Sequence, residues 1–135
     1  MEFSKIKELL STNFSDKFSF NEDVDIIFVH PSNWLEIATF LKNDKALDFN
    51  FLMCISGYDK DDGKTYGVAY NFYSISHSHY LEVRIEVEDG VKVPSISSLW
   101  SASDWHEREA YDMIGVVFEN HPKAFLQFYM SRMVN

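Results

Sequence analysis

Several kinds of residue that define functional classes are scarce in this sequence of 135 residues. Cys54 is the single cysteine, which excludes an intramolecular disulfide, and one thiolate by itself cannot hold an iron–sulfur cluster. Only 12 lysines and arginines stand against 21 aspartates and glutamates, a formal charge of −9. Nucleic acid and anionic lipid surfaces both require clustered basic side chains, so neither is an expected partner. Because no apolar run approaches the length of a bilayer span, we expect no direct membrane insertion, and we expect no secretory leader.

Apolar and aromatic residues are plentiful instead. Hydrophobic residues make up 46% of the chain and aromatic residues 16%, with only five glycines and three prolines. This composition excludes an intrinsically disordered chain, and the length fits one domain with a substantial core. Within the apolar run Phe51–Ile55, Cys54 is expected to be a small buried residue. The charges are mixed in sign along the chain, which predicts a solvated acidic surface.

The first third of the chain predicts a helix, two short strands and a second helix. Strands are expected at Phe18–Phe20 and Val24–Val29, joined by a turn at Asn21–Asp23. Pro31 opens the second helix, because its fixed φ is tolerated at the first helical position. Apolar residues at helical spacing mark the buried faces of these helices, namely Phe3, Ile6, Leu9 and Leu10 in the first and Trp34, Ile37, Ala38 and Leu41 in the second.

The middle of the chain predicts a β-meander of three strands, Phe49–Tyr58, Thr65–Ser74 and Tyr80–Glu88. The last strand alternates strictly between apolar and charged residues, which is typical of a sheet with one covered and one wetter face. An exit loop is expected at Val91–Pro94. The order of elements predicts the α+β class: a single domain with a mainly antiparallel sheet and helices packed on one side.

The most specific pattern lies in the segment Asp104–Pro122. Asp104 and Glu107 have the spacing of a D-x-x-E capping box, in which each side chain accepts a hydrogen bond at the start of a helix. Arg108 lies one helical turn from both Asp104 and Asp112, so it is within reach of either carboxylate. The pattern therefore predicts a helix that is held by its own charges.

After this helix, Gly115 offers the permissive backbone that lets a helix end, and Val116–Phe118 is a predicted short strand. His121 and Pro122 then form a predicted turn, since the residue before a proline is restricted to extended conformations.

This segment resembles the signature of the 30 kDa subunit of respiratory complex I, the proton-pumping NADH:quinone oxidoreductase. The family pattern is a tryptophan-bearing lead-in, then E-R-E-x-x-D, two bulky apolar residues, a glycine, and a His-Pro several residues later. The matching residues are Ser98–Trp105, Glu107–Asp112 and Met113–Pro122. The close similarity covers roughly residues 94–122 and upstream is limited to the order of elements.

The resemblance implies a cofactor-free accessory subunit of the peripheral arm, at the cytoplasmic face of the bacterial plasma membrane. It also implies that flavin and iron–sulfur clusters lie in other subunits, and that the quinone-site and iron–sulfur subunits are the partners. No catalytic, cofactor-binding or metal-binding residue is then expected in this chain. The signature residues either fix the helix inside the domain or meet a partner subunit; they are Trp105, Glu107, Arg108, Glu109, Asp112, Gly115, His121 and Pro122.

The chain departs from the family after His-Pro. Relatives carry an arginine pair there, followed by a longer basic segment, whereas this sequence has Phe125 and Leu126 near those positions and Arg132 as the last arginine. We therefore divide the chain into a domain at 1–122 and a divergent tail at 123–135. Docking is expected to be weaker or differently arranged, because arginines supply directional charge-assisted bonds. The sequence leaves open whether this is a truncated or a naturally short member of the family.

Other functions stay open at the level of sequence. A homologous subunit of a membrane-bound hydrogenase, or of a ferredoxin- or F420H2-linked complex, fits the same pattern. An autonomous metal-dependent enzyme is a second alternative, with His77, His79, His106 and Glu109 as ligands, although Ala110 takes the place of the second histidine of H-E-x-x-H. A free-standing interaction module that uses the aromatic tail is the third. No nucleotide-binding glycine motif and no serine nucleophile motif is present in the sequence.

Overall fold

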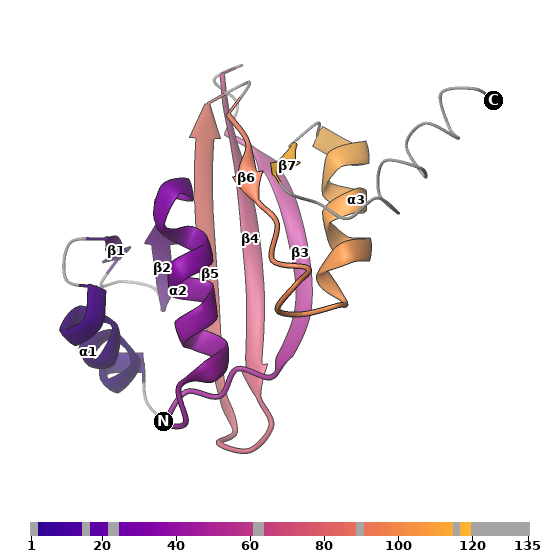
Figure 1. The fold of residues 1–135 in the computed structure, drawn as a ribbon. Helices are drawn as coiled ribbons and strands as arrows, with labels where there is room; N and C mark the ends of the chain where they lie inside the picture. Colours follow the sequence, from indigo (N-terminus) through magenta and orange to yellow (C-terminus); the bar gives the residue numbers. More distant parts are fainter. Residues whose placement is uncertain are drawn as a thin grey trace.

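The computed structural model describes residues 3–14, 17–21, 25–60, 64–88, 91–114 and 117–119. Its elements are, in chain order, α1 (Phe3–Phe14), β1 (Phe18–Asn21), β2 (Ile26–Val29), α2 (Pro31–Asn43), β3 (Phe51–Asp59), β4 (Thr65–Ser74), β5 (His79–Glu88), β6 (Val93–Pro94), α3 (Ser103–Ile114) and β7 (Phe118–Glu119). Five strands form a sheet in the order β1-β2-β5-β4-β3, and β6 pairs with β7 in a separate two-stranded sheet (Figure 1).

The main sheet is antiparallel except where β2 meets β5. The pairs β1–β2, β3–β4 and β4–β5 are antiparallel, while β2 and β5 run parallel with Ile27 opposite Val83. Helix α2 makes the crossover that a parallel pair requires: it carries the chain from β2 to the far edge, and the meander then returns β5 to the side of β2. The predicted α+β class with a mainly antiparallel sheet is confirmed.

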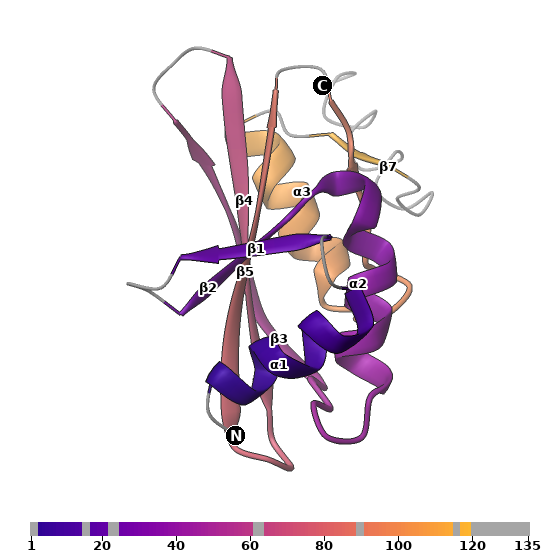
Figure 2. The same cartoon turned by 90° about the vertical axis from the view of Figure 1, so that its left-hand side faces the viewer.

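The helices lie on one side of the sheet. Figure 2 shows the sheet nearly edge-on, with α2 and α3 on the same side and α1 crossing at the edge formed by β1 and β2. Helix α1 packs against α2 through an edge-to-face contact of Phe14 with Phe40, whose ring centroids are 5.2 Å apart. The alternation predicted for β5 is confirmed: its inward residues are buried, namely Leu81, Val83, Ile85 and Val87.

Helix α2 forms where the sequence predicts it. His30 is its N-cap, with the ring Nδ1 accepting a hydrogen bond from the Ser32 N–H at 3.2 Å, and Pro31 follows as the first helical residue. At the other end the Asp44 N–H donates to the Phe40 carbonyl. The predicted apolar face is buried, namely Trp34, Ile37, Ala38 and Leu41.

Two predictions about the first strand of the meander require correction. Strand β3 begins at Phe51 rather than Phe49, because the Phe49 N–H donates to the Leu41 carbonyl at the end of α2 instead of joining the sheet. Cys54 is half-buried rather than buried. A β-bulge shifts the register between Leu52 and Cys54, so that Cys54 pairs with Asn71 on the outer face of the sheet while Leu52 faces the core.

The predicted exit loop at residues 91–94 contains a strand. The Val93 N–H donates to the Val117 carbonyl at 2.9 Å, and β6 runs parallel to β7 with Val93 opposite Phe118. Since α3 lies between these two strands in sequence, β6, α3 and β7 form a second parallel crossover unit. The predicted strand at 116–118 corresponds to β7, which begins at Phe118.

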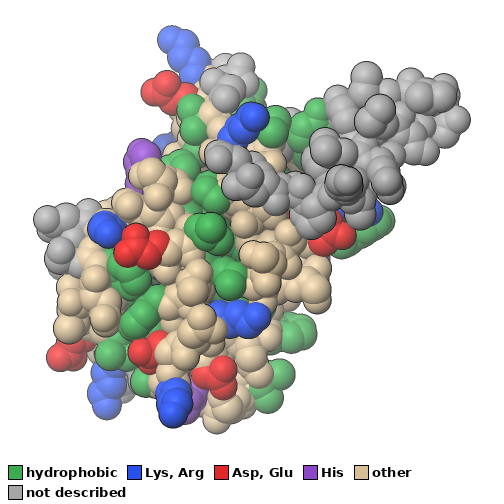
Figure 3. Space-filling view, in the orientation of Figure 1, with side chains coloured by type: hydrophobic (Ala, Val, Ile, Leu, Met, Phe, Trp, Pro, Cys, Tyr) green, Lys and Arg blue, Asp and Glu red, His purple; other side chains and the backbone are tan. Residues whose placement is uncertain are grey.

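Acidic and basic side chains are interspersed over the face seen in Figure 3. No helix in the described part of the chain is long and apolar enough to span a membrane.

Candidate functional site: the signature helix and its anchoring segment

Helix α3 carries the signature sequence and divides it into a buried and an exposed side. Ser103, Glu107 and Ala110 follow one another at intervals of four and three residues, and all three are buried. Trp105 points outward with 56% of its surface exposed. Among the signature residues, Glu107 is therefore buried in the domain while Trp105 is exposed to solvent.

Glu107 is the central residue of the buried side, since none of its surface is exposed. Its carboxylate accepts hydrogen bonds from the Ser95 hydroxyl at 2.7 Å, the Ile96 N–H at 3.0 Å and the Ser103 hydroxyl at 2.7 Å. We call Glu107 with these three residues the Glu107 anchor. It fastens α3 to the segment that follows β6, and charge-assisted bonds of this kind are stronger than bonds between neutral groups.

The capping box predicted from the sequence takes a different form. Helix α3 begins at Ser103, so Asp104 lies within its first turn instead of flanking it. The Glu107 carboxylate bonds to the Ser103 side chain and to a segment eleven and twelve residues away, which the local D-x-x-E spacing does not indicate. In the sequence, the serines at positions 95 and 103 were the only indication of these partners of Glu107, because hydroxyl groups are common donors to a buried carboxylate.

The Glu107 anchor borders an aromatic part of the core. The Tyr70 hydroxyl and the Trp34 indole N–H are buried, and the rings of these residues are 4.8 Å apart. Burial raises the pKa of the Tyr70 hydroxyl well above its ordinary value, and the negative charge of Glu107 raises it further. Tyr70 is therefore neutral at physiological pH, so it adds no second negative charge near the Glu107 carboxylate.

Arg108 and Asp104 form the ion pair that the sequence predicts. The Arg108 guanidinium lies 3.2 Å from the Asp104 carboxylate, with 14% and 33% of the two side chains exposed. The side chain of Asp112, the other predicted partner, lies outside the described residues, as do Gly115, His121 and Pro122.

The exposed side of α3 carries Trp105, His106 and Glu109. The His106 ring lies 3.8 Å from the Glu109 carboxylate, whose side chain is 51% exposed. An ion pair at this distance and exposure contributes little to stability. Trp105 and Glu109 thus remain accessible, whereas Glu107 is enclosed within the domain and does not present its charge to a partner.

His77 and His79, considered above as metal ligands, are hydrogen-bonded to backbone carbonyl groups. His79 is the first residue of β5 and is buried, with its Nε2 atom 2.6 Å from the Leu47 carbonyl oxygen. The His77 Nε2 atom lies 2.8 Å from the Lys45 carbonyl oxygen. Within the described ranges, no group of three or more histidine, cysteine, aspartate or glutamate side chains is placed to hold a metal ion.

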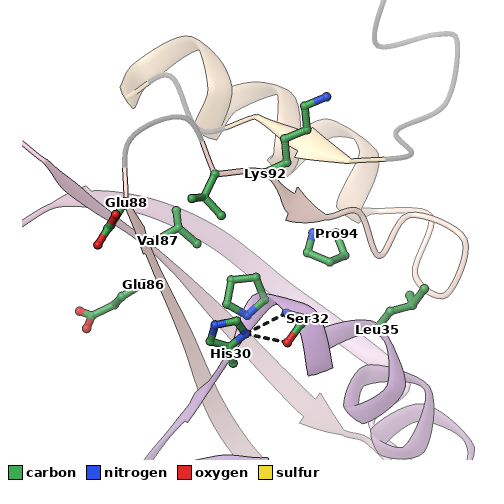
Figure 4. A pocket seen from close by; sticks show the side chains of 10 residues that line it. His30, Ser32, Leu35, Glu86, Val87, Glu88, Lys92 and Pro94 are labelled. Atoms are coloured by element: carbon green, nitrogen blue, oxygen red, sulfur yellow. Dashed lines mark hydrogen bonds between the residues drawn. The ribbon is translucent and has the colours of Figure 1, made fainter.

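A groove of about 690 Å³ lies between the start of α2, the end of β5 and β6 (Figure 4). Its lining includes His30, Val87 and Pro94. The His30 ring is bonded to the N–H and hydroxyl groups of Ser32, while the Glu86 and Lys92 side chains point in opposite directions. The Glu86 and Lys92 side chains therefore do not converge in the groove.

The outer face of the sheet carries an ordered network of polar side chains. Glu86 accepts a hydrogen bond from the Tyr58 hydroxyl at 2.9 Å and pairs with Lys60 at 3.1 Å. On the same strand, Arg84 pairs with Glu82 at 2.6 Å. The contacts of Glu86 with Tyr58 and Lys60 connect β5 to β3 and the residue that follows it, across β4, so they stabilise the sheet on the side that the helices leave uncovered.

The fold and the site define a small α+β domain. The buried carboxylate of the signature helix, Glu107, is hydrogen-bonded to residues of this same domain. The chain belongs to the family of the 30 kDa subunit of respiratory-chain NADH dehydrogenase, whose model matches residues 27–131. The resemblance noted in the sequence is thereby confirmed.

Individual relatives agree with this assignment, and each is the corresponding subunit of a quinone oxidoreductase. The relative from the NADH-quinone oxidoreductase of Chloroherpeton thalassium is 45% identical over 91 residues, which are 66% of this chain and 38% of the relative. The relative from the NAD(P)H-quinone oxidoreductase of Prochlorococcus marinus is 36% identical over 128 residues, 87% of this chain and 72% of the relative. The relative from the NADH-quinone oxidoreductase of Chlorobium phaeobacteroides is 37% identical, and the match spans 66% of this chain and 55% of that protein. The chain thus spans between about two fifths and three quarters of these relatives.

A solved structure shares the fold. One polypeptide of the membrane-bound sulfane sulfur reductase, an archaeal respiratory membrane complex, superimposes with a TM-score of 0.73. The match includes 89% of this chain and 71% of that polypeptide at 16% sequence identity. At this level of identity the likeness establishes the architecture alone.

Proposed function

We propose that this chain is an accessory subunit of the peripheral arm of a proton-translocating NADH:quinone oxidoreductase. It supports electron transfer from NADH to quinone by positioning its neighbours and takes no part in the chemistry. In this proposal flavin and iron–sulfur clusters belong to partner subunits, and this subunit has no cofactor of its own. Its partners are the quinone-site and iron–sulfur subunits, and it is held peripherally at the cytoplasmic face of the plasma membrane.

Two observations support this proposal: the family to which the chain belongs, and the burial and hydrogen bonding of Glu107. A carboxylate that served as a general acid or base would need access to a substrate. Glu107 is fully buried and accepts bonds from three donors of its own domain, so its role is to fix α3 against the preceding segment. A rigid helix is what a docking surface requires, because ordering it beforehand lowers the entropy lost on binding.

The exposed side of α3 is the surface that we assign to a partner subunit. Trp105 is large and 56% exposed, and tryptophan is among the residues that contribute most to protein interfaces. Glu109 supplies a charge beside it. We include Gly115, His121 and Pro122 in this surface on the basis of the signature sequence alone.

Co-purification tests the proposal. The full-length chain with an affinity tag is expressed in cells that assemble the complex, and bound proteins are identified and quantified by mass spectrometry. We expect the quinone-site and iron–sulfur subunits in amounts equal to the tagged chain. Recovery of the intact chain as a lone protein from such cells would refute the function.

A matched pair of variants tests the docking surface separately. Trp105→Ala is expected to lose about 2 kcal/mol of binding free energy, roughly thirty-fold in affinity, as for a central interface tryptophan. Leu35→Ala removes a comparably exposed side chain, 43% accessible, from α2 and should leave recovery unchanged. Circular dichroism confirms that both variants are folded. Equal recovery with both variants would show that the partner binds another surface, while leaving the subunit assignment intact.

The same experiment separates the related complexes. A hydrogenase or a ferredoxin- or F420H2-linked complex would yield its own electron-input subunits in place of the NADH-oxidising ones.

A further inference from the structure

Two histidines fasten the turn between β4 and β5 to the connection between α2 and β3. The His77 Nε2 atom is 2.8 Å from the Lys45 carbonyl oxygen, and the His79 Nε2 atom is 2.6 Å from the Leu47 carbonyl oxygen. The two rings stack on each other, with centroids 5.5 Å apart and planes inclined by 20°. Both histidines therefore bind the same short segment of backbone from one side.

Two further hydrogen bonds flank this pair. The Ser76 hydroxyl donates to the Asp48 carboxylate at 2.6 Å, and the Ile75 N–H donates to the Asn50 side-chain oxygen at 3.1 Å. Asp48 also has a φ of 42°, a left-handed conformation that a non-glycine residue holds only when its surroundings favour it. The connection between α2 and β3 is thus held both by Asp44, whose carbonyl accepts the Asp48 N–H at 2.7 Å, and by contacts with the turn.

The protonation state of the rings follows from these partners. A carbonyl oxygen only accepts, so each Nε2 atom carries the hydrogen and the neutral ring has its lone pair on Nδ1. His79 is 4% exposed, and its Nδ1 atom is buried with no hydrogen-bond partner among the described residues. Protonation places a hydrogen and a positive charge on this atom, where no acceptor meets it and where the second imidazole is stacked.

We propose that His77 and His79, with the carbonyl groups of Lys45 and Leu47, form a histidine latch that is closed when the His79 ring is neutral and opens when that ring is protonated. Opening reaches the signature helix through Phe49, whose ring lies 4.7 Å from the His79 ring. The Phe49 carbonyl accepts the Trp100 indole N–H at 2.8 Å, and Trp100 precedes α3. The latch thus links local acidity to the segment that holds α3, beyond the positioning role proposed above.

The surroundings of His79 include influences that lower its pKa and influences that raise it. Burial is the largest influence and lowers the pKa of His79, and the neighbouring His77 ring lowers it further. The hydrogen bond to the Leu47 carbonyl and the Asp48 carboxylate oppose this shift. The net direction is downward, so the closed latch binds a proton less readily than the open one.

The sign of the pH dependence follows. An open, solvated histidine titrates near its ordinary pKa of about 6.5, while the latched His79 titrates lower. Above about pH 6.5 neither state binds the proton and the latch is fully stable. As the pH falls below that value, the open state is protonated first. The opening equilibrium then increases up to roughly tenfold for each pH unit between the two pKa values.

Hydrogen exchange of the full 135-residue chain tests the latch. The informative amides are those of Phe49, which donates to the Leu41 carbonyl, and Ile75. After correction for intrinsic exchange rates, we expect both to open at least about threefold more often at about pH 5.5 than at about pH 8. In the double variant H77Q/H79Q each glutamine retains an N–H donor but does not titrate, so this pH dependence should disappear. His106→Gln, a matched change on the surface of α3, should retain it.

Two results would overturn the proposal: equal protection of these amides at both pH values, or the same pH dependence in H77Q/H79Q. If the double variant fails to fold, NMR titration of the histidine rings in the unmodified chain decides the question. We expect the His79 midpoint below the ordinary histidine pKa of about 6.5, near the pH at which the increase in exchange at Phe49 levels off. A His79 midpoint at or above the ordinary value would refute the latch.

Discussion

Replacement of Glu107 with glutamine removes the buried charge of the anchor while it retains nearly the same shape. The glutamine has one accepting oxygen in place of two, so it still serves the Ile96 N–H, and the serine hydroxyls rotate to accommodate the new amide hydrogens. What is lost is the charge on the acceptor of three short hydrogen bonds. We therefore expect Glu107→Gln to fold with reduced stability.

The magnitude follows from the three contacts. Hydrogen bonds to charged groups contribute about 1.5–3 kcal/mol and neutral ones about 0.5–1.5, so three bonds lose about 3 kcal/mol in total. A neutral amide is easier to bury than a carboxylate, which offsets part of this loss. We expect a net destabilisation of about 1–2 kcal/mol for Glu107→Gln. Glu107→Ala leaves the Ile96 N–H without its acceptor and opens a cavity, so about 3–5 kcal/mol is expected.

Urea unfolding, followed by the fluorescence of the buried residues Trp34 and Trp100, measures these differences. The control is Glu109→Gln, the same chemical change two residues away at an exposed position, which should alter stability by less than about 0.5 kcal/mol. Exchange of the Ile96 amide should rise in the Glu107 variants and stay unchanged in the control. If Glu107→Gln and Glu109→Gln have the same stability, the anchor does not hold α3 and the reasoning fails.

Two further stability predictions concern α3 and the outer face of the sheet. Arg108→Ala should destabilise the chain by about 0.5–1.5 kcal/mol, because its pair with Asp104 is half-buried, whereas Lys17→Ala, in an exposed pair, should change stability by less than about 0.3 kcal/mol. Thermal unfolding of the two variants checks this, and equal shifts in Tm would contradict it. Gly67→Ala should cost about 1–2 kcal/mol, since an added Cβ overlaps the Tyr58 ring. In a Tyr58→Ala background the same change should cost less than about 0.5 kcal/mol, and an undiminished cost would contradict the overlap.

The elements that the sequence predicts well are those whose signal is local. The period of β5 and the apolar face of α2 follow from side-chain direction within one strand or one helix, and both are present. The Arg108–Asp104 pair is also a matter of helical spacing.

The features that the sequence did not predict depend on residues far apart in the chain. The parallel pairing of β2 with β5 joins segments more than fifty residues apart, and the pairing of β6 with β7 depends on the course of α3 between them. The bulge at Leu52 reverses the side of the sheet on which Cys54 lies, and no local residue indicates it. Glu107 was predicted to cap its own helix, but its partners at Ser95 and Ile96 come together only when the chain folds.

The central proposal is that this chain supports the assembly of an NADH:quinone oxidoreductase without taking part in its reaction. The most direct test measures, in membranes from cells with progressively less of the chain, the amount of assembled complex and the rate of NADH:quinone turnover per assembled complex. Assembly should decline with the chain, while turnover per complex stays constant. Membranes that keep the fully assembled complex but lose turnover would contradict the claim.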